Sequence, residues 1–214
     1  MLTKEKTSYY DIDFDVEEFL VKNGMIEESF YLRDLKQRKL FIETEICQET
    51  VDDAIHHIMQ FNREDAGIAP KERKPILLYV CSNGGSVDAG LSLIDVILAS
   101  KTPVYTINLG YQYSMGFLIG LAGHKRFASA NAKFLHHDGT NMIVNSSAKV
   151  KDQMEFQDKV EARIKSYVLS RTKITEEEYD ARLRQEWYLF ADEAKRYGMT
   201  DYIIGIDCDI DEIV

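Results

Sequence analysis

The sequence contains few prolines and no low-complexity tract, so it offers no obvious linker between domains. Three prolines are spread over 214 residues, and a chain of this length fits one domain with a sizeable core, with or without appendages. We expect an N-terminal arm (residues 1–30), a core domain (residues 31–206) and an acidic C-terminal tail (residues 207–214).

Long apolar runs are also missing. No stretch approaches the roughly 20 apolar residues that a transmembrane helix requires. The first residues lack the apolar segment of a secretory signal. We therefore expect a cytoplasmic protein that does not enter a membrane.

Cysteine and positive charge are scarce. Cys47, Cys81 and Cys208 show none of the spacings typical of metal ligands or redox pairs, so we expect reduced, structural thiols. Lysine and arginine number 26 against 36 acidic residues, which gives a net charge of −10. This balance argues against nucleic acid or an anionic membrane surface as the main partner.

Residues 104–123 are the most informative stretch. The β-branched and apolar residues 104–109 predict a buried strand, Gly110 permits a turn with positive φ, and residues 115–122 predict a helix buried on every side. Ser114 lies at this turn. The unpaired N–H groups at the start of a helix suit a developing oxyanion, but serine is also a favoured N-cap residue. At this point both interpretations of Ser114 stay open.

A second strand and loop precede this stretch. Residues 76–81 form a continuous apolar run, which predicts a parallel strand buried on both faces, and residues 82–86 (SNGGS) lead into a helix over residues 88–100. This alternation predicts an α/β fold. Because functional groups in such folds lie beyond the carboxyl ends of the strands, residues 82–86 should meet residues 110–114. The diglycine makes either a tight turn or a close backbone approach to a substrate carbonyl.

The rest of the chain predicts further elements. A long charged helix over residues 146–171 is typical of a solvent-bridging or assembly surface. The tail over residues 207–214 is acidic and is expected to be exposed. The other expected elements are strands over residues 38–43, 125–128 and 133–137, a short segment over residues 186–190, and helices over residues 48–62, 175–183 and 191–197.

Two adjacent histidines end the expected strand over residues 133–137. Histidine can remove a proton from serine at neutral pH. Neighbouring strand residues point to opposite faces, so only one of His136 and His137 can face Ser114. A carboxylate must then orient the imidazole. Spacing alone does not rank the candidate carboxylates, which are Asp138, Asp180, Glu186 and Asp192.

Four stretches make the sequence resemble the proteolytic subunit of the Clp protease. They are CSNGGSVDAGLSLID, GYQYSMGFLIGLAG, KRFASANAKFLHH and FADEAKRYGMTD, in the family's order and near its spacings. The resemblance runs from about Leu35 to Ile204. It implies a crotonase-like α/β fold of repeated ββα units with a protruding handle helix, and a serine protease domain over residues 31–206.

The resemblance also implies roles for individual residues. Ser114 matches the nucleophile of the family, and His137, rather than His136, matches its general base. The N–H groups of Gly85 and Met115 match the two donors of the oxyanion hole. No metal or organic cofactor is implied.

Some positions depart from the family pattern. Glu186 falls on the position of the triad acid, where the family has aspartate. Asn83 replaces the proline before the diglycine, and Gln185 replaces an arginine used in contacts between rings. The N-terminal arm is longer than usual. These departures concern assembly and partner choice more than the chemistry.

By resemblance, the working form is a double stack of heptameric rings that encloses the sites. Residues 1–30 are expected to form a mobile arm, a docking element or a gate segment, and the sequence alone does not choose among these. An ATP-driven unfoldase of the AAA+ class would feed it polypeptide substrates. Two other functions stay open: a catalytically weak ring subunit that supports an active paralogue, and a crotonase-type acyl-CoA enzyme.

Overall fold

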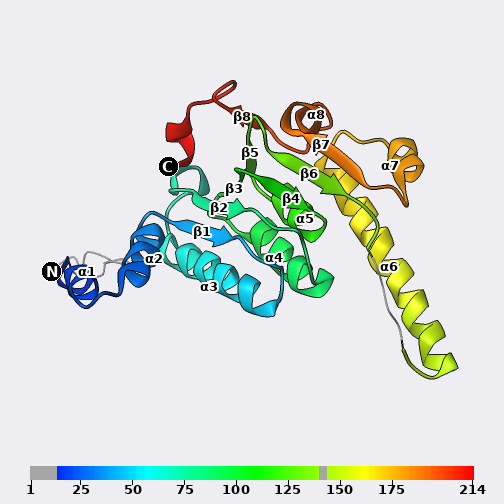
Figure 1. Ribbon diagram of the computed structural model, residues 1–214, viewed down its shortest axis with the longest axis horizontal. Coiled ribbons are helices and arrows are strands. Elements are labelled where there is room, and N and C mark those ends of the chain that lie inside the picture. The colour runs from blue at the N-terminus through cyan, green and yellow to red at the C-terminus, as the bar shows by residue number, and fades with distance from the viewer. Residues whose placement is uncertain (1–13, 140–143) are drawn as a thin grey trace.

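The computed structural model describes residues 14–139 and 144–214, and its strands form two sheets with helices packed against them (Figure 1). The strands are β1 (Lys39–Ile42), β2 (Ile76–Val80), β3 (Val104–Asn108), β4 (Tyr111–Tyr113), β5 (Lys125–Ser129), β6 (Lys133–His136), β7 (Trp187–Phe190) and β8 (Tyr202–Ile204). The helices are α1 (Phe14–Lys22), α2 (Ile26–Lys36), α3 (Gln48–Glu64), α4 (Val87–Ala99), α5 (Met115–Leu121), α6 (Ser147–Arg171), α7 (Glu176–Arg182) and α8 (Ala191–Arg196), with the 3₁₀ turns η1 (Pro70–Glu72) and η2 (Ile210–Ile213).

The larger sheet is parallel and has the strand order β1-β2-β3-β5-β8. Strand β2 pairs with β3 in a register that places Ile76 beside Val104, and β2 is buried along most of its length. The expected α/β class and the parallel arrangement are therefore confirmed. Because the strands are parallel, the loops that follow β2 and β3 leave the sheet at the same edge.

The smaller sheet contains β4, β6 and β7. Strand β4 is parallel to β6, and β7 runs antiparallel to β6. Strands β3 and β5 are each followed by a strand of the smaller sheet and then by a helix, which gives the repeated ββα units expected from the resemblance. The sequence pattern missed β4, because a strand of three residues is defined by its partners rather than by its own periodicity.

The two faces of the larger sheet carry different covers. Alternate residues of β2, such as Leu78, point into the main core, which α3, α4 and α5 complete. The intervening residue Leu77 belongs to a small second cluster with Ile107 and Phe127. The expected burial of the apolar helix α5 is confirmed, since all of its residues are buried.

The C-terminal tail covers the second cluster, so the expectation of an exposed tail holds for most of its residues but is wrong for Ile213. Ile213, on η2, is only 1% exposed and packs among Leu77, Ile107 and Phe127. The hydroxyl of Tyr79 donates a hydrogen bond to the Ile213 carbonyl. The physical reason is that this sheet face presents apolar side chains whose burial is favourable. The acidic composition of the tail predicts exposure and does not reveal that Ile213 is buried.

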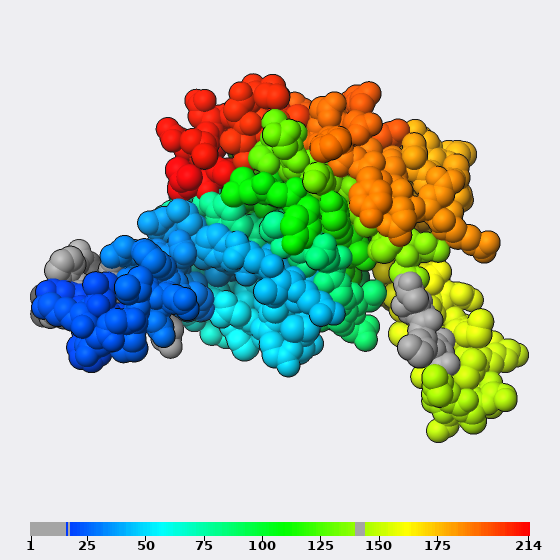
Figure 2. Space-filling model, in the orientation of Figure 1, coloured from blue at the N-terminus to red at the C-terminus, as the bar shows by residue number. Residues whose placement is uncertain are grey.

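Helix α6 extends away from the body of the molecule (Figures 1 and 2). Along this helix, which the structure describes from end to end, Val168 is the one buried residue. Near its far end, Met154 and Phe156 are 56% and 65% exposed. The protruding handle helix that the resemblance implies is therefore present, with apolar side chains in contact with solvent.

The N-terminal arm contains α1 and α2, while its first residues, including Tyr9 and Tyr10, lie outside the described range. Exposed apolar side chains lie on both helices, for example Phe19 and Phe30. Helix α2 runs across residue 30, the expected end of the arm. The division into arm, core domain and tail stays a prediction.

Candidate active site

Ser114 lies between β4 and α5 in a backbone conformation that non-glycine residues seldom adopt, with φ 53° and ψ −120°. The positive φ expected at Gly110 is therefore found at Ser114 instead. A serine that caps a helix has extended backbone and accepts a hydrogen bond from the first turn. The Ser114 side chain makes no such bond, so the capping interpretation is wrong. Strain of this kind costs about 1–3 kcal/mol and is often found at functional sites.

The loop after β2 meets the loop after β3, as the α/β pattern predicts. The Tyr113 N–H donates to the Ser82 carbonyl at 3.0 Å. A Cβ atom at Gly84 would lie 2.7 Å from the Ser114 Cβ and 3.0 Å from the Met115 nitrogen. Gly84, the first glycine of the pair, is therefore required, because any side chain there would clash with Ser114.

The second glycine is required for a different contact. Gly85 has φ 148°, and a Cβ atom there would lie 2.3 Å from the Ile46 carbonyl oxygen. Among the described residues, no acceptor takes the Gly85 N–H. Met115 is the first residue of α5, and its N–H likewise has no partner within the helix. Two backbone donors near Ser114 are therefore free to bind an anionic oxygen.

The pairing of β6 with β7 brings His137 to Glu186. The register places His136 opposite Trp187, so the residues just beyond each strand face one another. The His137 Nδ1 atom lies 2.9 Å from the Glu186 Oε1 atom. If Nδ1 donates to this carboxylate, the Nε2 atom is left unprotonated and can accept a proton.

The other three candidate carboxylates have different surroundings. Asp180 pairs with Lys165 at 2.7 Å. Asp138 is exposed at the wall of the cavity described below, and Asp192 lies in the first turn of α8. Of the four, Glu186 is the one within hydrogen-bond distance of the His137 ring.

The Glu186 carboxylate has a largely solvated environment, since its side chain is 57% exposed. Tyr188, two residues further on, lies beside it. Partial desolvation and the Glu186 charge raise the pKa of the Tyr188 phenol. The Tyr188 ring contacts the Tyr113 ring edge to face at 5.8 Å. Sequence reasoning did not single out either tyrosine, although their spacing from Ser114 and Glu186 could have drawn attention to them.

His136 has an environment unlike that of its neighbour. Its ring packs against Phe117 at 5.4 Å and against Tyr179 at 5.1 Å between centroids. Burial lowers the pKa of His136 to about 4, with the neighbouring His137 adding to the shift. His136 is therefore neutral at physiological pH, and it is His137 that holds the carboxylate contact.

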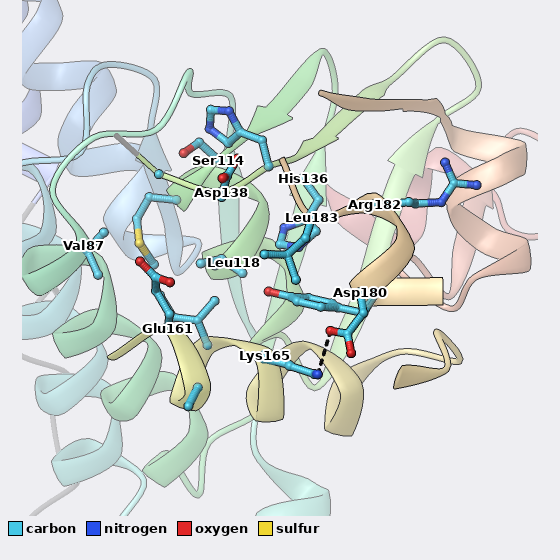
Figure 3. A pocket seen from close by; sticks show the side chains of 16 residues that line it. Val87, Ser114, Leu118, His136, Asp138, Glu161, Lys165, Asp180, Arg182 and Leu183 are labelled. Carbon is cyan, nitrogen blue, oxygen red and sulfur yellow. Dashed lines mark hydrogen bonds and ion pairs between the residues drawn. The ribbon is translucent and has the colours of Figure 1, made fainter. Parts of the chain in front are cut away.

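A cavity of about 270 Å³ connects these groups (Figure 3). Ser114 and His137 both line it, together with residues from α6 and α7. Within the described part of the chain, the Ser114 hydroxyl makes no hydrogen bond to His137. Such bonds often form only when substrate is bound. The arrangement places a hydroxyl, a histidine held by a carboxylate and the Met115 N–H beside one cavity, with the Gly85 N–H in the adjoining diglycine loop.

Two further searches covered only residues 14–139 and 144–214. In these ranges no helix is both long enough and apolar enough to span a bilayer. In the same ranges no group of three or more histidine, cysteine or acidic side chains could hold a metal ion.

Comparison with known proteins shows which family this chain resembles. The model of the Clp protease family matches residues 22–207. The ATP-dependent Clp protease proteolytic subunit 2 of Treponema pallidum (strain Nichols) is 28% identical over 186 residues, which cover 86% of this chain and 90% of that protein. The family match begins at the end of α1 and continues past β8, so it includes both sheets and the cavity.

Proposed function

The chain belongs to the Clp protease family, and on that premise we propose that it is the proteolytic subunit of an ATP-dependent Clp protease, a cytoplasmic serine endopeptidase. The observation that carries the assignment of residues is the 2.9 Å contact between His137 and Glu186 beside the cavity that Ser114 lines. This contact supports a triad of Ser114, His137 and Glu186.

In the proposed reaction, the Ser114 Oγ atom attacks a peptide carbonyl while the His137 Nε2 atom takes its proton. The carbonyl oxygen becomes an oxyanion, which the N–H groups of Gly85 and Met115 bind. His137 then gives the proton to the leaving amine, and the C–N bond breaks to leave an acyl-enzyme. Water then attacks the carbonyl of the acyl-enzyme ester while His137 takes a proton from it. His137 returns the proton to the Ser114 Oγ atom, which releases the carboxylic acid product and regenerates Ser114.

Glu186 acts through His137 in this scheme. Its carboxylate accepts the Nδ1 proton, holds the tautomer with a free Nε2, and stabilises the imidazolium that forms. The glutamate side chain is one methylene longer than aspartate. It reaches His137 because β7 begins one residue after it, with Trp187 directly opposite His136 at the end of β6.

The assembly is part of the proposal. Members of the family form rings that work with Clp ATPases, and we propose a double heptameric ring that encloses the cavity. An AAA+ unfoldase would deliver unfolded polypeptide. The exposed Met154 and Phe156 on the protruding α6 support a contact with a second subunit, because large apolar side chains at such a position favour burial.

A second candidate function is a catalytically weak ring subunit that supports an active paralogue. The exposure of Glu186 and the lack of a bond from Ser114 to His137 among the described residues favour it. No observation favours the acyl-CoA enzyme.

A serine-reactive phosphonate probe tests the proposal. We expect the wild-type protein to be labelled at Ser114 and to hydrolyse unstructured peptides, whereas Ser114→Ala should lose labelling and about 10⁶-fold in kcat. A folded wild-type assembly that is neither labelled nor active supports the weak subunit. Peptide hydrolysis that survives Ser114→Ala contradicts the triad.

A further inference from the structure

The cavity beside Ser114 has exposed acidic groups at its rim and apolar side chains inside (Figure 3). Lys165 and Asp180 also line it, and their charges pair with each other at 2.7 Å. At the rim, Asp138 and Glu161 are exposed. Inside, Met115 and Leu118 present buried apolar walls. A side chain that enters the cavity therefore leaves water and meets mostly apolar surface, with acidic groups at the entrance.

Two polar rings also line the cavity. The rings of His136 and Tyr179 both line the cavity and contact each other at 5.1 Å with an angle of 46° between their planes. Among the residues that the structure describes, none makes a hydrogen bond to a His136 ring nitrogen or to the Tyr179 hydroxyl. A polar group in an apolar wall gains free energy when a ligand supplies its missing partner.

Both groups are uncharged at neutral pH. Burial lowers the pKa of His136 to about 4, and burial raises the pKa of the Tyr179 phenol. The neutral imidazole offers one N–H donor and one nitrogen acceptor, and the phenol offers an O–H donor and an oxygen acceptor. The wall therefore complements a group that both donates and accepts hydrogen bonds and carries no charge.

The substrate residue that reaches this wall is the one whose carbonyl Ser114 attacks. When its carbonyl carbon lies at the Ser114 Oγ, its side chain branches from the adjacent Cα and lies in the nearest cavity. An acidic side chain at that place would be repelled by Asp138 and Glu161. A cationic side chain would lose its hydration against Leu118 and Met115.

We propose that His136 and Tyr179 determine substrate specificity, and that they select a long neutral side chain with a hydrogen-bonding end, such as glutamine or tyrosine, for the residue whose carbonyl is attacked. This inference rests on the proposed protease function. A site that hydrogen-bonds a substrate group discriminates against the analogue that lacks it. The effect of one such bond is about tenfold.

The test uses the assembled wild-type protein and fluorogenic peptides in matched pairs that differ only at this residue. One pair carries glutamine or methionine, which have similar length and shape, and the other carries tyrosine or phenylalanine. We expect kcat/KM to be about tenfold higher for glutamine and for tyrosine. Peptides with lysine or glutamate at this residue should be cleaved more slowly than the glutamine peptide.

Two variants assign the effect to the wall. Tyr179→Phe removes only the hydroxyl, and His136→Leu replaces the imidazole by an apolar side chain of similar size. Each variant should bring the glutamine-to-methionine ratio of kcat/KM, the tyrosine-to-phenylalanine ratio, or both toward one. Tyr105→Phe, on the far face of the larger sheet, is the matched control and should keep both ratios.

Each outcome decides the question. Ratios near one, reversed ratios, or a preference for lysine in the wild type overturn the inference, and these measurements do not depend on whether the variants fold. Ratios that stay high in both folded variants also overturn it. A wild-type protein that cleaves no peptide and is not labelled at Ser114 overturns the protease function and this inference together. Cleavage with the wrong preference overturns the specificity alone.

Discussion

His137 and Glu186 are 49 residues apart in the sequence, yet their side chains are 2.9 Å apart at the open end of the β6–β7 ladder. The antiparallel register, with His136 opposite Trp187, places both residues just beyond the paired strands. Their contact thus depends on backbone pairing, and the glutamate side chain remains largely in water.

Glu186→Gln should lower peptide hydrolysis strongly while leaving the fold intact. The amide keeps the size of the side chain but removes the charge that stabilises the imidazolium, and it can favour the wrong tautomer. Losses near 10⁴-fold in kcat have precedent for such a change. Steady-state kinetics on a peptide substrate provide the measurement. Glu177→Gln, an exposed acid in the first turn of α7, is the matched control and should be neutral. Equal rates for the two variants would mean that another group orients His137.

Met154→Ser combined with Phe156→Ser should weaken the assembly. Both side chains are more than half exposed near the far end of α6, and a subunit contact there would lose apolar burial. Light scattering after size-exclusion chromatography should show smaller particles than for wild type. Lys159→Ser, an exposed polar position on the same helix, should leave the particle mass unchanged. A wild-type protein that is monomeric would contradict the ring proposal itself.

Asp65→Asn should destabilise the fold, because it breaks a buried pair. The Arg38 guanidinium contacts both carboxylate oxygens of Asp65 at 2.7 Å, and Asp65 is 3% exposed. Loss of the Asp65 charge leaves the largely buried Arg38 with only the longer ion-pair contact to Glu64 at 3.9 Å among the described residues, and breaking a buried pair costs about 3–5 kcal/mol. Urea unfolding at pH 7 measures the loss. Asp95→Asn, at an exposed position on α4, should change the free energy of unfolding little.

The Arg38–Asp65 pair should make the free energy of unfolding depend on pH, and the direction of this dependence can be predicted. Burial opposes ionisation of Asp65, but hydrogen bonds from Arg38 and Thr102 outweigh it and lower the pKa below its ordinary 3.8. The stabilisation is therefore complete above about pH 4 and is lost as the pH falls through the lower folded-state pKa. The difference in unfolding free energy between wild type and Asp65→Asn should narrow over that acidic range. If the difference in unfolding free energy between wild type and Asp65→Asn widened toward low pH, the lowered pKa of Asp65 would be contradicted.

Ile213→Ala should loosen the C-terminal segment from the sheet. The side chain is 1% exposed among Leu77, Ile107 and Phe127, and truncation of a buried isoleucine costs about 2 kcal/mol or more. Hydrogen exchange of the amides in η2 should become faster. Ile210→Ala removes an isoleucine that is 60% exposed on the same turn and should have little effect. Equal exchange in both variants would show that Ile213 does not anchor the tail.

Local pattern alone determined much of this protein. The apolar run of β2, the all-apolar α5 and the capping box of α7, in which Thr175 and Glu178 bond each other's backbone, each depend on residues close in sequence. Their periodicity and chemistry therefore predict them directly. The convergence of the diglycine loop and Ser114 also followed from sequence, because parallel strands direct their carboxyl ends to one edge.

Tertiary structure decided the rest. Four carboxylates were equally eligible by spacing, and only the pairing of β6 with β7 brought Glu186 to His137. The positive φ at Ser114, rather than Gly110, arises where the residue is held between β4 and α5, with its N–H bound to the Leu135 carbonyl of β6. The tail docks because the far sheet face presents apolar side chains from three strands. These features depend on groups distant in sequence that meet only after the chain has folded, so no local pattern records them.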